Sequence, residues 1–286
     1  MSRPATVSSM LERAISVLEG AGVPNARVDA ELLAGHVLRL SRGGVQAKVA
    51  TDSVLSAEDA VALSGLVERR AAREPLQHIT GVAPFRSREL AVGPGVFVPR
   101  PETEVVAQYA IDALAASAGP TPIGVDLGTG SGAIALAMAT EVPHALVYGV
   151  EVSPRAFVWT RQNFRGVENA HAVFTDLAVA LPELDGTVDV VISNPPYIPL
   201  GAVPRDPEVR LHDPEIALYG GADGLDVLRQ VSTSALRLLR PGGTLVLEHG
   251  ELQAAAIAAL LSQDGWRAIA HHRDLLGRDR ATTALR

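Results

Sequence analysis

The spacing of hydrophobic residues changes near residue 78 and predicts two parts of different architecture. In residues 5–75, apolar positions recur three and four residues apart, as Leu11, Ile15 and Leu18 do, which is typical of amphipathic helices. Ser56, with Asp59 three residues later, has the form of a capping box at the start of a further helix. Residues 1–78 are therefore predicted to form a small helical bundle.

The pattern after residue 78 indicates strands. Residues 79–98 contain short β-prone pieces separated by Gly and Pro, which predicts a hairpin linker. From residue 99 to residue 286, strand and helix patterns then alternate, and this alternation predicts an α/β, Rossmann-like fold with a parallel sheet covered on both faces. Strands are predicted at Ile123–Leu127, Ala145–Val150, Val188–Ser193 and Thr244–Leu247. Ser153-Pro154 is expected to begin a helix, and another is predicted over Leu225–Leu239.

Composition narrows the class of protein. The chain is 47% hydrophobic and 20% charged, as in soluble globular proteins, and no apolar run reaches the roughly 18 residues of a membrane span. The first seven residues lack the apolar segment of a secretory signal, and the absence of cysteine excludes disulfides and Cys-ligated zinc. The histidines do not cluster, so no metal site is predicted. We expect a cytoplasmic protein with no membrane partner.

The charge is unevenly distributed. Residues 1–98 carry 11 basic and 10 acidic groups, a net of +1, whereas the remaining 14 basic and 22 acidic groups give residues 99–286 a net of −8. Sequence-independent binding to DNA or RNA needs a basic face, so direct nucleic-acid binding is not expected. One stretch of the chain is enriched in arginine, and we interpret its side chains as part of a solvent-exposed face. These residues are Arg69, Arg70, Arg73, Arg86 and Arg88.

A glycine-rich loop follows the first predicted strand of the α/β part. It runs from Asp126 through Gly128, Thr129, Gly130, Ser131 and Gly132 into a helix. Glycines allow the backbone to turn tightly and approach a ligand at the N-terminus of that helix. Glu151, at the end of the second strand, can accept hydrogen bonds from ribose hydroxyls. This loop is a candidate cofactor site.

Three interpretations of this loop remain: it binds S-adenosylmethionine, it binds NAD, or it is a tight turn that binds no ligand. Gly128, Gly130 and Ala133 satisfy the G-x-G-x-x-A form of the dinucleotide fingerprint, and Glu151 stands at a suitable distance for NAD. Asp126 favours S-adenosylmethionine, because an acid entering the loop suits a cationic amino-acid cofactor better than a pyrophosphate.

The segment Asn194-Pro195-Pro196-Tyr197 follows the strand Val188–Ser193. Prolines extend a strand poorly, and a polar amide and an aromatic ring flank them at the edge of the sheet where ligands bind. The Asn194 side-chain oxygen and the Pro195 carbonyl could each accept one N–H of a planar NH2 group and favour its pyramidal, nucleophilic form. Tyr197 could pack against the substrate. These residues predict transfer of a methyl group to an amide or an exocyclic amine.

The loop Asp126–Gly132 together with Asn194–Tyr197 resembles the amino-methyltransferases that use S-adenosylmethionine. Several further segments resemble the release factor glutamine methyltransferase family in particular, and the resemblance covers nearly the whole chain. These segments are Glu74–Gly81, Val98–Glu104, Ala222–Leu225, Leu247–Gly250 and Asp274–Arg280. The family more often has Asp where Glu151 stands and an aromatic residue where Leu177 stands.

The resemblance implies methylation of the glutamine side-chain amide in the Gly-Gly-Gln motif of class I peptide chain release factors, with S-adenosylhomocysteine as the second product. By position, Gly128–Gly132 and Glu151 would hold the cofactor, Asp176 and Leu177 would flank its adenine, and Pro99–Glu104 would close over its methionine end. Asn194 would touch both cofactor and glutamine, and Pro195, Pro196 and Tyr197 would hold the glutamine. The helical domain would dock the release factor, and we expect a monomer.

Two other functions share parts of these motifs. A DNA or RNA adenine amino-methyltransferase would use the same Asn194–Tyr197 segment, but it would also need a basic cleft or a target-recognition domain to bind the nucleic acid. An NAD-dependent oxidoreductase would leave that segment unexplained. The proline-containing loop 199–219 is predicted to be a lid or a substrate-docking loop. Glu248-His249, at a strand end, could neighbour the active site, but it is interpreted as a satisfied structural pair.

Overall fold

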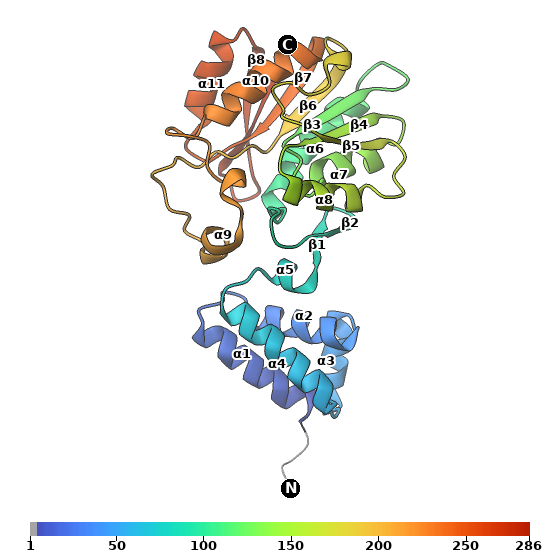
Figure 1. Ribbon diagram of the computed structural model, residues 1–286, viewed down its shortest axis with the longest axis vertical. Coiled ribbons are helices and arrows are strands. Elements are labelled where there is room, and N and C mark those ends of the chain that lie inside the picture. The colour runs from blue at the N-terminus through green and yellow to red at the C-terminus, as the bar shows by residue number, and fades with distance from the viewer. Residues whose placement is uncertain (1–4) are drawn as a thin grey trace. The chain divides into compact units, whose positions relative to one another are not determined.

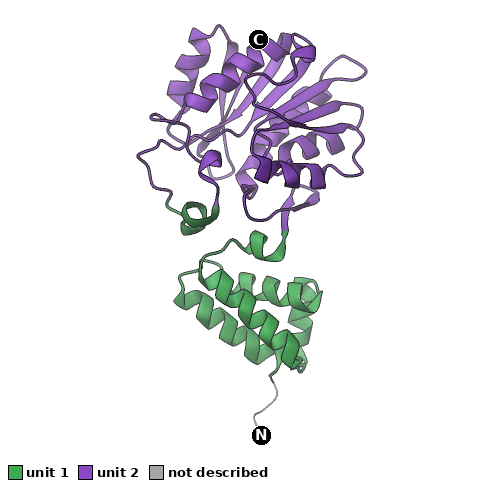
Figure 2. Ribbon diagram, in the orientation of Figure 1, with its two compact units in different colours: residues 1–81, 205–212 green, residues 82–204, 213–286 purple. Residues whose placement is uncertain are grey.

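The computed structural model describes residues 5–286, which divide into two compact units (Figures 1 and 2). Unit 1 comprises the described residues up to Gly81 together with residues 205–212, and unit 2 comprises residues 82–204 and 213–286. Within the described residues, no helix has the length and apolarity needed to cross a membrane.

Unit 1 is helical, as the sequence predicts. The helices pack around a core that includes Leu18, Leu33 and Val45, each with no exposed surface. The predicted cap at Ser56 is confirmed, because its hydroxyl accepts a hydrogen bond from the Asp59 backbone N–H. The helices are α1 (Val7–Gly20), α2 (Ala26–Leu38), α3 (Arg42–Ala50), α4 (Ala57–Ala71), α5 (Leu76–Thr80) and α9 (Pro207–His212).

Helix α9 joins this unit through a buried ion-pair cluster. Glu208 contacts Arg70 at 2.8 Å and Arg73 at 2.6 Å, and Arg70 also contacts Asp29 at 2.7 Å. Burial disfavours the charged form of Glu208, but hydrogen bonds from Arg73 and Arg70 outweigh it and lower its pKa to about 2. The prediction of a solvated basic face was therefore wrong for Arg70 and Arg73. Their partner lies far away in the sequence, in the loop 199–219.

Unit 2 begins with a hairpin, which confirms the predicted one over Val82–Ala91, whereas residues 79 and 80 at the predicted start belong to helix α5. Strands β1 (Val82–Phe85) and β2 (Arg88–Ala91) pair antiparallel with Phe85 opposite Arg88. The side chains of Ala83, Phe85 and Leu90 are buried in the hydrophobic core of unit 2.

A seven-stranded sheet forms the centre of unit 2, in the order β5-β4-β3-β6-β7-β9-β8. The five strands from β5 to β7 are parallel, and β9 pairs antiparallel with both of its neighbours. The strands are β3 (Ile123–Leu127), β4 (Leu146–Glu151), β5 (Ala170–Phe174), β6 (Val188–Ser193), β7 (Leu239–Glu248), β8 (Arg267–Arg273) and β9 (Asp279–Leu285).

Both faces of the sheet are covered, so its central strands are apolar on both sides. In β6, Val190 and Ile192 belong to one core cluster and Val191 to the other. The first cluster includes residues of α6 and α7, and the second includes residues of α10 and α11. The helices are α6 (Pro101–Ala115), α7 (Ala133–Glu141), α8 (Pro154–Asn163), α10 (Asp226–Leu238) and α11 (Ala254–Gln263), with 3-10 turns at Pro182–Leu184 and Glu215–Ala217.

The sequence misplaced the start of β7. The helix predicted over Leu225–Leu239 and the strand predicted at Thr244–Leu247 left residues 240–243, Arg-Pro-Gly-Gly, between them. In the structure β7 begins at Leu239. An irregular register between Val188 and Val190 accommodates the additional residues.

The connections along the sheet reverse direction between β3 and β6. The chain passes from β3 outward to β4 and β5, and then returns to form β6 on the other side of β3. Asp126 of β3 lies opposite Ile192 of β6. The loops that follow these two strands therefore emerge side by side at the carboxyl edge, which is where open α/β sheets bind ligands.

Candidate active site

The glycine loop after β3 turns through a backbone conformation that suits glycine. Gly128, Gly130 and Gly132 have φ values of 77°, 59° and 85°. The backbone N–H groups of Gly128 and Thr129 both donate to the Val150 carbonyl at 2.9 Å. The loop is thereby fixed to the end of β4.

Asp126 lies beneath this loop and holds it together. Its Oδ2 accepts hydrogen bonds from the Thr129 hydroxyl at 2.6 Å and from the Ala135 N–H at 3.2 Å. Burial raises the pKa of Asp126 to about 7, against the opposing effect of these two hydrogen bonds. Its side chain does not line the cavity described below. In this structure Asp126 supports the loop from behind.

Glu151, at the end of β4, faces the same loop. Its Oε2 accepts from the Gly130 N–H at 2.8 Å and its Oε1 from the Ser153 N–H at 2.7 Å. Burial raises its pKa, and these backbone hydrogen bonds oppose the change. Each carboxylate oxygen has a second lone pair, so the group can still accept hydrogen bonds from ligand hydroxyls.

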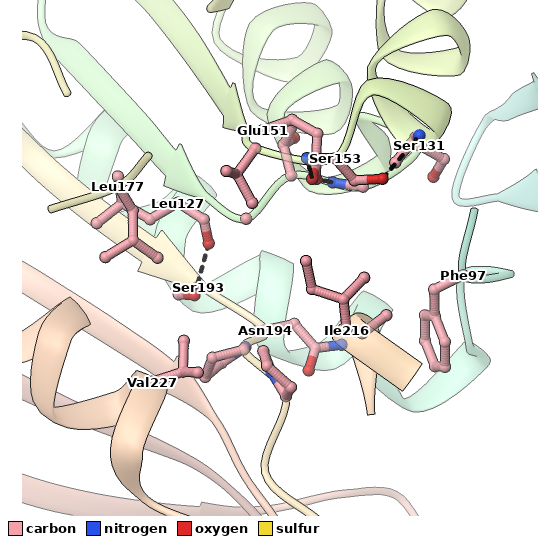
Figure 3. Close-up of a pocket in the computed structure, with 18 of the residues that line it drawn as sticks. Phe97, Leu127, Ser131, Glu151, Ser153, Leu177, Ser193, Asn194, Ile216 and Val227 are labelled. Carbon is pink, nitrogen blue, oxygen red and sulfur yellow. Dashed lines mark hydrogen bonds between the residues drawn. The ribbon is translucent and has the colours of Figure 1, made fainter. Parts of the chain in front are cut away.

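A cavity of about 220 Å³ opens at the carboxyl edge of the sheet (Figure 3). Glu151 and Ser153 lie on one side of it, and Asn194 and Ile216 lie on the other. Of the residues predicted from the sequence, twelve line it: Pro99, Thr103, Gly128, Thr129, Gly130, Ser131, Glu151, Asp176, Leu177, Asn194, Pro195 and Pro196. Asp126, Gly132 and Tyr197 are not among the lining residues.

Asn194 follows β6 directly and presents its amide to the cavity. The preceding Ser193 hydroxyl donates to the Leu127 carbonyl at 2.6 Å, which joins the ends of β6 and β3. The Asn194 Nδ2 donates to the Thr103 hydroxyl at 3.5 Å. Within residues 5–286, neither the Asn194 Oδ1 nor the Pro195 carbonyl receives a hydrogen bond. Two acceptors are thus open to a ligand.

Tyr197 packs behind the cavity. Its ring joins the core cluster of α10 and α11, and its carbonyl accepts from the Gln253 Nε2 at 3.0 Å. Burial, together with the charge of Glu248, raises the pKa of its hydroxyl to about 12. Tyr197 is therefore a neutral phenol that supports the segment after β6.

Several lining residues had no signal in the sequence. Phe97 precedes α6, and Val227 and Gln230 lie on α10. Their apolar or neutral side chains carry no motif, and only the fold brings them to the sheet edge. Within residues 5–286, no group of His, Asp and Glu side chains could hold a metal ion.

Comparisons with known proteins agree with this arrangement over the whole chain. Residues 9–81 match the PrmC N-terminal domain, and residues 91–203 match the methyltransferase small domain. A release factor glutamine methyltransferase from Streptomyces coelicolor is 49% identical, with 93% of each chain covered. The chain belongs to the release factor glutamine methyltransferase family.

The chain is also similar to an enzyme of a different name and to a solved structure. A 4-amino-L-phenylalanine/4-methylamino-L-phenylalanine methyltransferase from Streptomyces pristinaespiralis is 40% identical, over 91% of this chain and 88% of its own. Among solved structures, a methyltransferase from Pyrococcus furiosus matches with a TM-score of 0.50 and 22% identity, over 68% of this chain and 87% of that one. The chain is an S-adenosylmethionine-dependent methyltransferase, and its cofactor is S-adenosylmethionine.

Proposed function

We propose that this protein methylates N(5) of the glutamine in the Gly-Gly-Gln motif of class I peptide chain release factors. The single observation that carries the proposal is the pair of open acceptors, the Asn194 Oδ1 and the Pro195 carbonyl, at the mouth of a glycine-loop cavity. The 49% identity to a release factor glutamine methyltransferase supports the choice of acceptor. Because release factors act in translation, we also propose that the reaction takes place in the cytoplasm.

The lining of the cavity fits the cofactor by its chemistry. Glu151 has lone pairs free for ribose hydroxyls, and Leu177 offers an apolar surface to adenine beside Asp176. Phe97 and Thr103 line the cavity from the segment ahead of α6 and from its first turn. When bound, S-adenosylmethionine supplies an electrophilic methyl group on a sulfonium.

Asn194 and Pro195 act on the acceptor nitrogen. An amide nitrogen is a weak nucleophile because its lone pair is delocalised into the carbonyl. When its two hydrogens are donated to Oδ1 of Asn194 and the carbonyl of Pro195, the nitrogen is held in one orientation and pyramidal geometry is favoured. The adjacent prolines keep both acceptors in place. After transfer the nitrogen becomes acidic, so it can lose its proton to solvent.

The helical unit is proposed to dock the release factor. None of its described residues lines the cavity. Its match to the PrmC N-terminal domain nonetheless indicates that it belongs to this family's architecture.

A second acceptor class comes from one relative. The Streptomyces pristinaespiralis enzyme is named for an aromatic amine, 4-amino-L-phenylalanine. Aromatic amines share with amides a planar NH2 group whose lone pair is delocalised, so the same two acceptors could hold either.

The test is radiolabelled methyl transfer with four acceptors in separate reactions. They are an unmodified release factor, the same factor with Asn replacing the Gln of its Gly-Gly-Gln motif, 4-amino-L-phenylalanine, and duplex DNA. We expect label only on the unmodified factor, mapped by mass spectrometry to the motif glutamine. Label on the amino acid or on DNA, with none on the release factor, would overturn the proposal.

A further inference from the structure

Glu248 is a buried carboxyl group close to the proposed acceptor site. It ends β7, the strand beside β6, and the pairing of Ser193 with Leu247 places it next to the segment that begins at Asn194. Only 2% of Glu248 is exposed. Its Oε2 has no hydrogen-bond partner within residues 5–286. The interpretation of Glu248 as part of a satisfied structural pair is therefore wrong for this oxygen.

His249, by contrast, has partners for both of its ring nitrogens. Its Nε2 lies 2.8 Å from the Thr282 hydroxyl and its Nδ1 lies 2.9 Å from the Gly250 carbonyl. Both ring nitrogens are thus engaged, and they are engaged away from Glu248.

The groups that face Glu248 come from three elements. Thr103 and Glu102 lie on α6, Asn194 and Tyr197 follow β6, and Arg280 lies on β9. Burial raises the pKa of Glu248 to about 7. Hydrogen bonds from Thr103 and Asn194 and the charge of Arg280 lower it, whereas the charge of Glu102 raises it. The carboxyl therefore changes protonation near neutral pH.

Thr103 connects Glu248 to Asn194. Its hydroxyl accepts a hydrogen bond from the Asn194 Nδ2 at 3.5 Å. A hydroxyl carries one proton of its own, and hydrogen bonding from Thr103 to Glu248 leaves that proton directed at the carboxyl. An ionised carboxylate can only accept. The direction of the chain from the Asn194 N–H through the Thr103 O–H to Glu248 is then fixed.

We infer that Glu248 is a positioning residue, which acts both directly and through Thr103 to hold the Asn194 amide with its nitrogen turned into the protein and its oxygen turned toward the acceptor nitrogen. This inference rests on the proposed function. Without a fixed acceptor at the end of the chain, the Asn194 amide can rotate and present its NH2 group to the substrate. Two donors would then face each other and the substrate amide would not be held.

Protonation of Glu248 also removes the fixed orientation of the Asn194 amide. A protonated carboxyl can donate to the Thr103 oxygen and reverse the chain. The wild-type methyl-transfer rate is therefore expected to rise with pH through about 7 as the carboxylate forms.

The first test is Glu248→Gln in the full-length protein, with Glu251→Gln as the matched control on an exposed carboxylate. Glutamine keeps the size of the side chain but can present either a donor or an acceptor. We expect kcat to fall on the order of 10- to 100-fold, with little change in affinity for S-adenosylhomocysteine. The rise in rate through pH 7 should disappear. Glu251→Gln should retain both rate and pH profile.

The second test uses Thr103, in case Glu248→Gln folds poorly. Thr103→Ser keeps the hydroxyl and Thr103→Val replaces it with a methyl group. We expect the serine variant to keep most of the activity and the valine variant to lose it. Equal activity of the two would show that the hydroxyl does not transmit the effect.

A third readout does not depend on the methyl acceptor. In the wild-type protein, the NMR signals of the Asn194 side-chain NH2 should shift with a midpoint near pH 7, and in Glu248→Gln they should not. If this titration is seen but no release factor is methylated, the proposed function fails and the coupling stands. If wild type methylates the factor while Glu248→Gln matches it in kcat and pH profile, the positioning role is refuted.

Discussion

Asn194 is the residue on which the proposed chemistry depends most directly. Its Oδ1 is one of two acceptors for the substrate amide, and its Nδ2 is held by Thr103. Asn194→Ala is expected to lower methyl transfer by a factor on the order of 10² to 10³, the range for loss of one positioned polar group. Affinity for S-adenosylhomocysteine should change only modestly. Steady-state kinetics and calorimetric titration test the two statements, and an alanine variant with near wild-type turnover would exclude the assigned role.

Asp126 makes a separate prediction about stability. Its folded-state pKa is raised from 3.8 to about 7 because it is buried. Between these values the folded protein holds a proton that the unfolded chain has lost, so the free energy of unfolding falls as pH rises through this range. Asp126→Asn removes this titration and keeps an oxygen for the Thr129 and Ala135 donors.

Thermal denaturation between pH 5 and 8 measures the effect of Asp126→Asn. The variant should lose less of its Tm across this range than the wild type does. If the two profiles remain parallel, Asp126 does not titrate there in the folded protein.

The glycine loop is the element in which backbone conformation and packing can be tested apart. Gly130 and Gly132 both have positive φ, so alanine costs about 1–2 kcal/mol at either position. A Cβ at residue 132 would also lie 2.5 Å from Cε1 of Phe164, whereas nothing lies within 4 Å of one at residue 130.

Gly132→Ala should therefore lower the free energy of unfolding more than Gly130→Ala, as measured by chemical denaturation. Combining Gly132→Ala with Phe164→Leu should recover part of the difference, because the smaller side chain leaves room for the methyl group. Equal losses in the two single variants would mean that Phe164 moves aside without cost.

At the scale of the whole molecule, the residues that line the cavity all belong to unit 2, and none of the described residues of the helical unit is among them. Deletion of residues 1–81 is expected to leave S-adenosylhomocysteine binding within a few-fold of the full-length value. Methylation of an intact release factor should fall at least tenfold, because a docking surface is lost, whereas a short Gly-Gly-Gln peptide should be methylated at a similar rate by both proteins. Equal activity of both proteins on the intact factor would show that the unit does not dock it.

The deletion needs one control. Arg70 and Arg73 would be lost with the helical unit, leaving Glu208 without them. Glu208→Gln in the full-length protein separates the loss of this ion-pair cluster from the loss of the docking surface. A fall in activity equal to that of the deletion would assign the effect to the loop 199–219.

The sequence by itself determined the class of fold and the two loops that carry the site. Strand and helix patterns are local, and glycine and proline restrict the backbone wherever they stand. The alternation from Ile123 onward, the loop Gly128–Gly132 and the segment after Ser193 were therefore predictable. The parallel topology then implied that both loops meet at one edge of the sheet.

Only the tertiary structure decided which side chains enter the cavity and which support it from behind. Asp126 turns under the glycine loop, Tyr197 packs into the core, and Glu248 comes to lie near Asn194. Glu208 pairs with arginines of a different part of the chain. These contacts join residues far apart in the sequence, so no local spacing encodes them. They follow from the order of strands in the sheet and from the burial of charges, which must find partners once water is excluded.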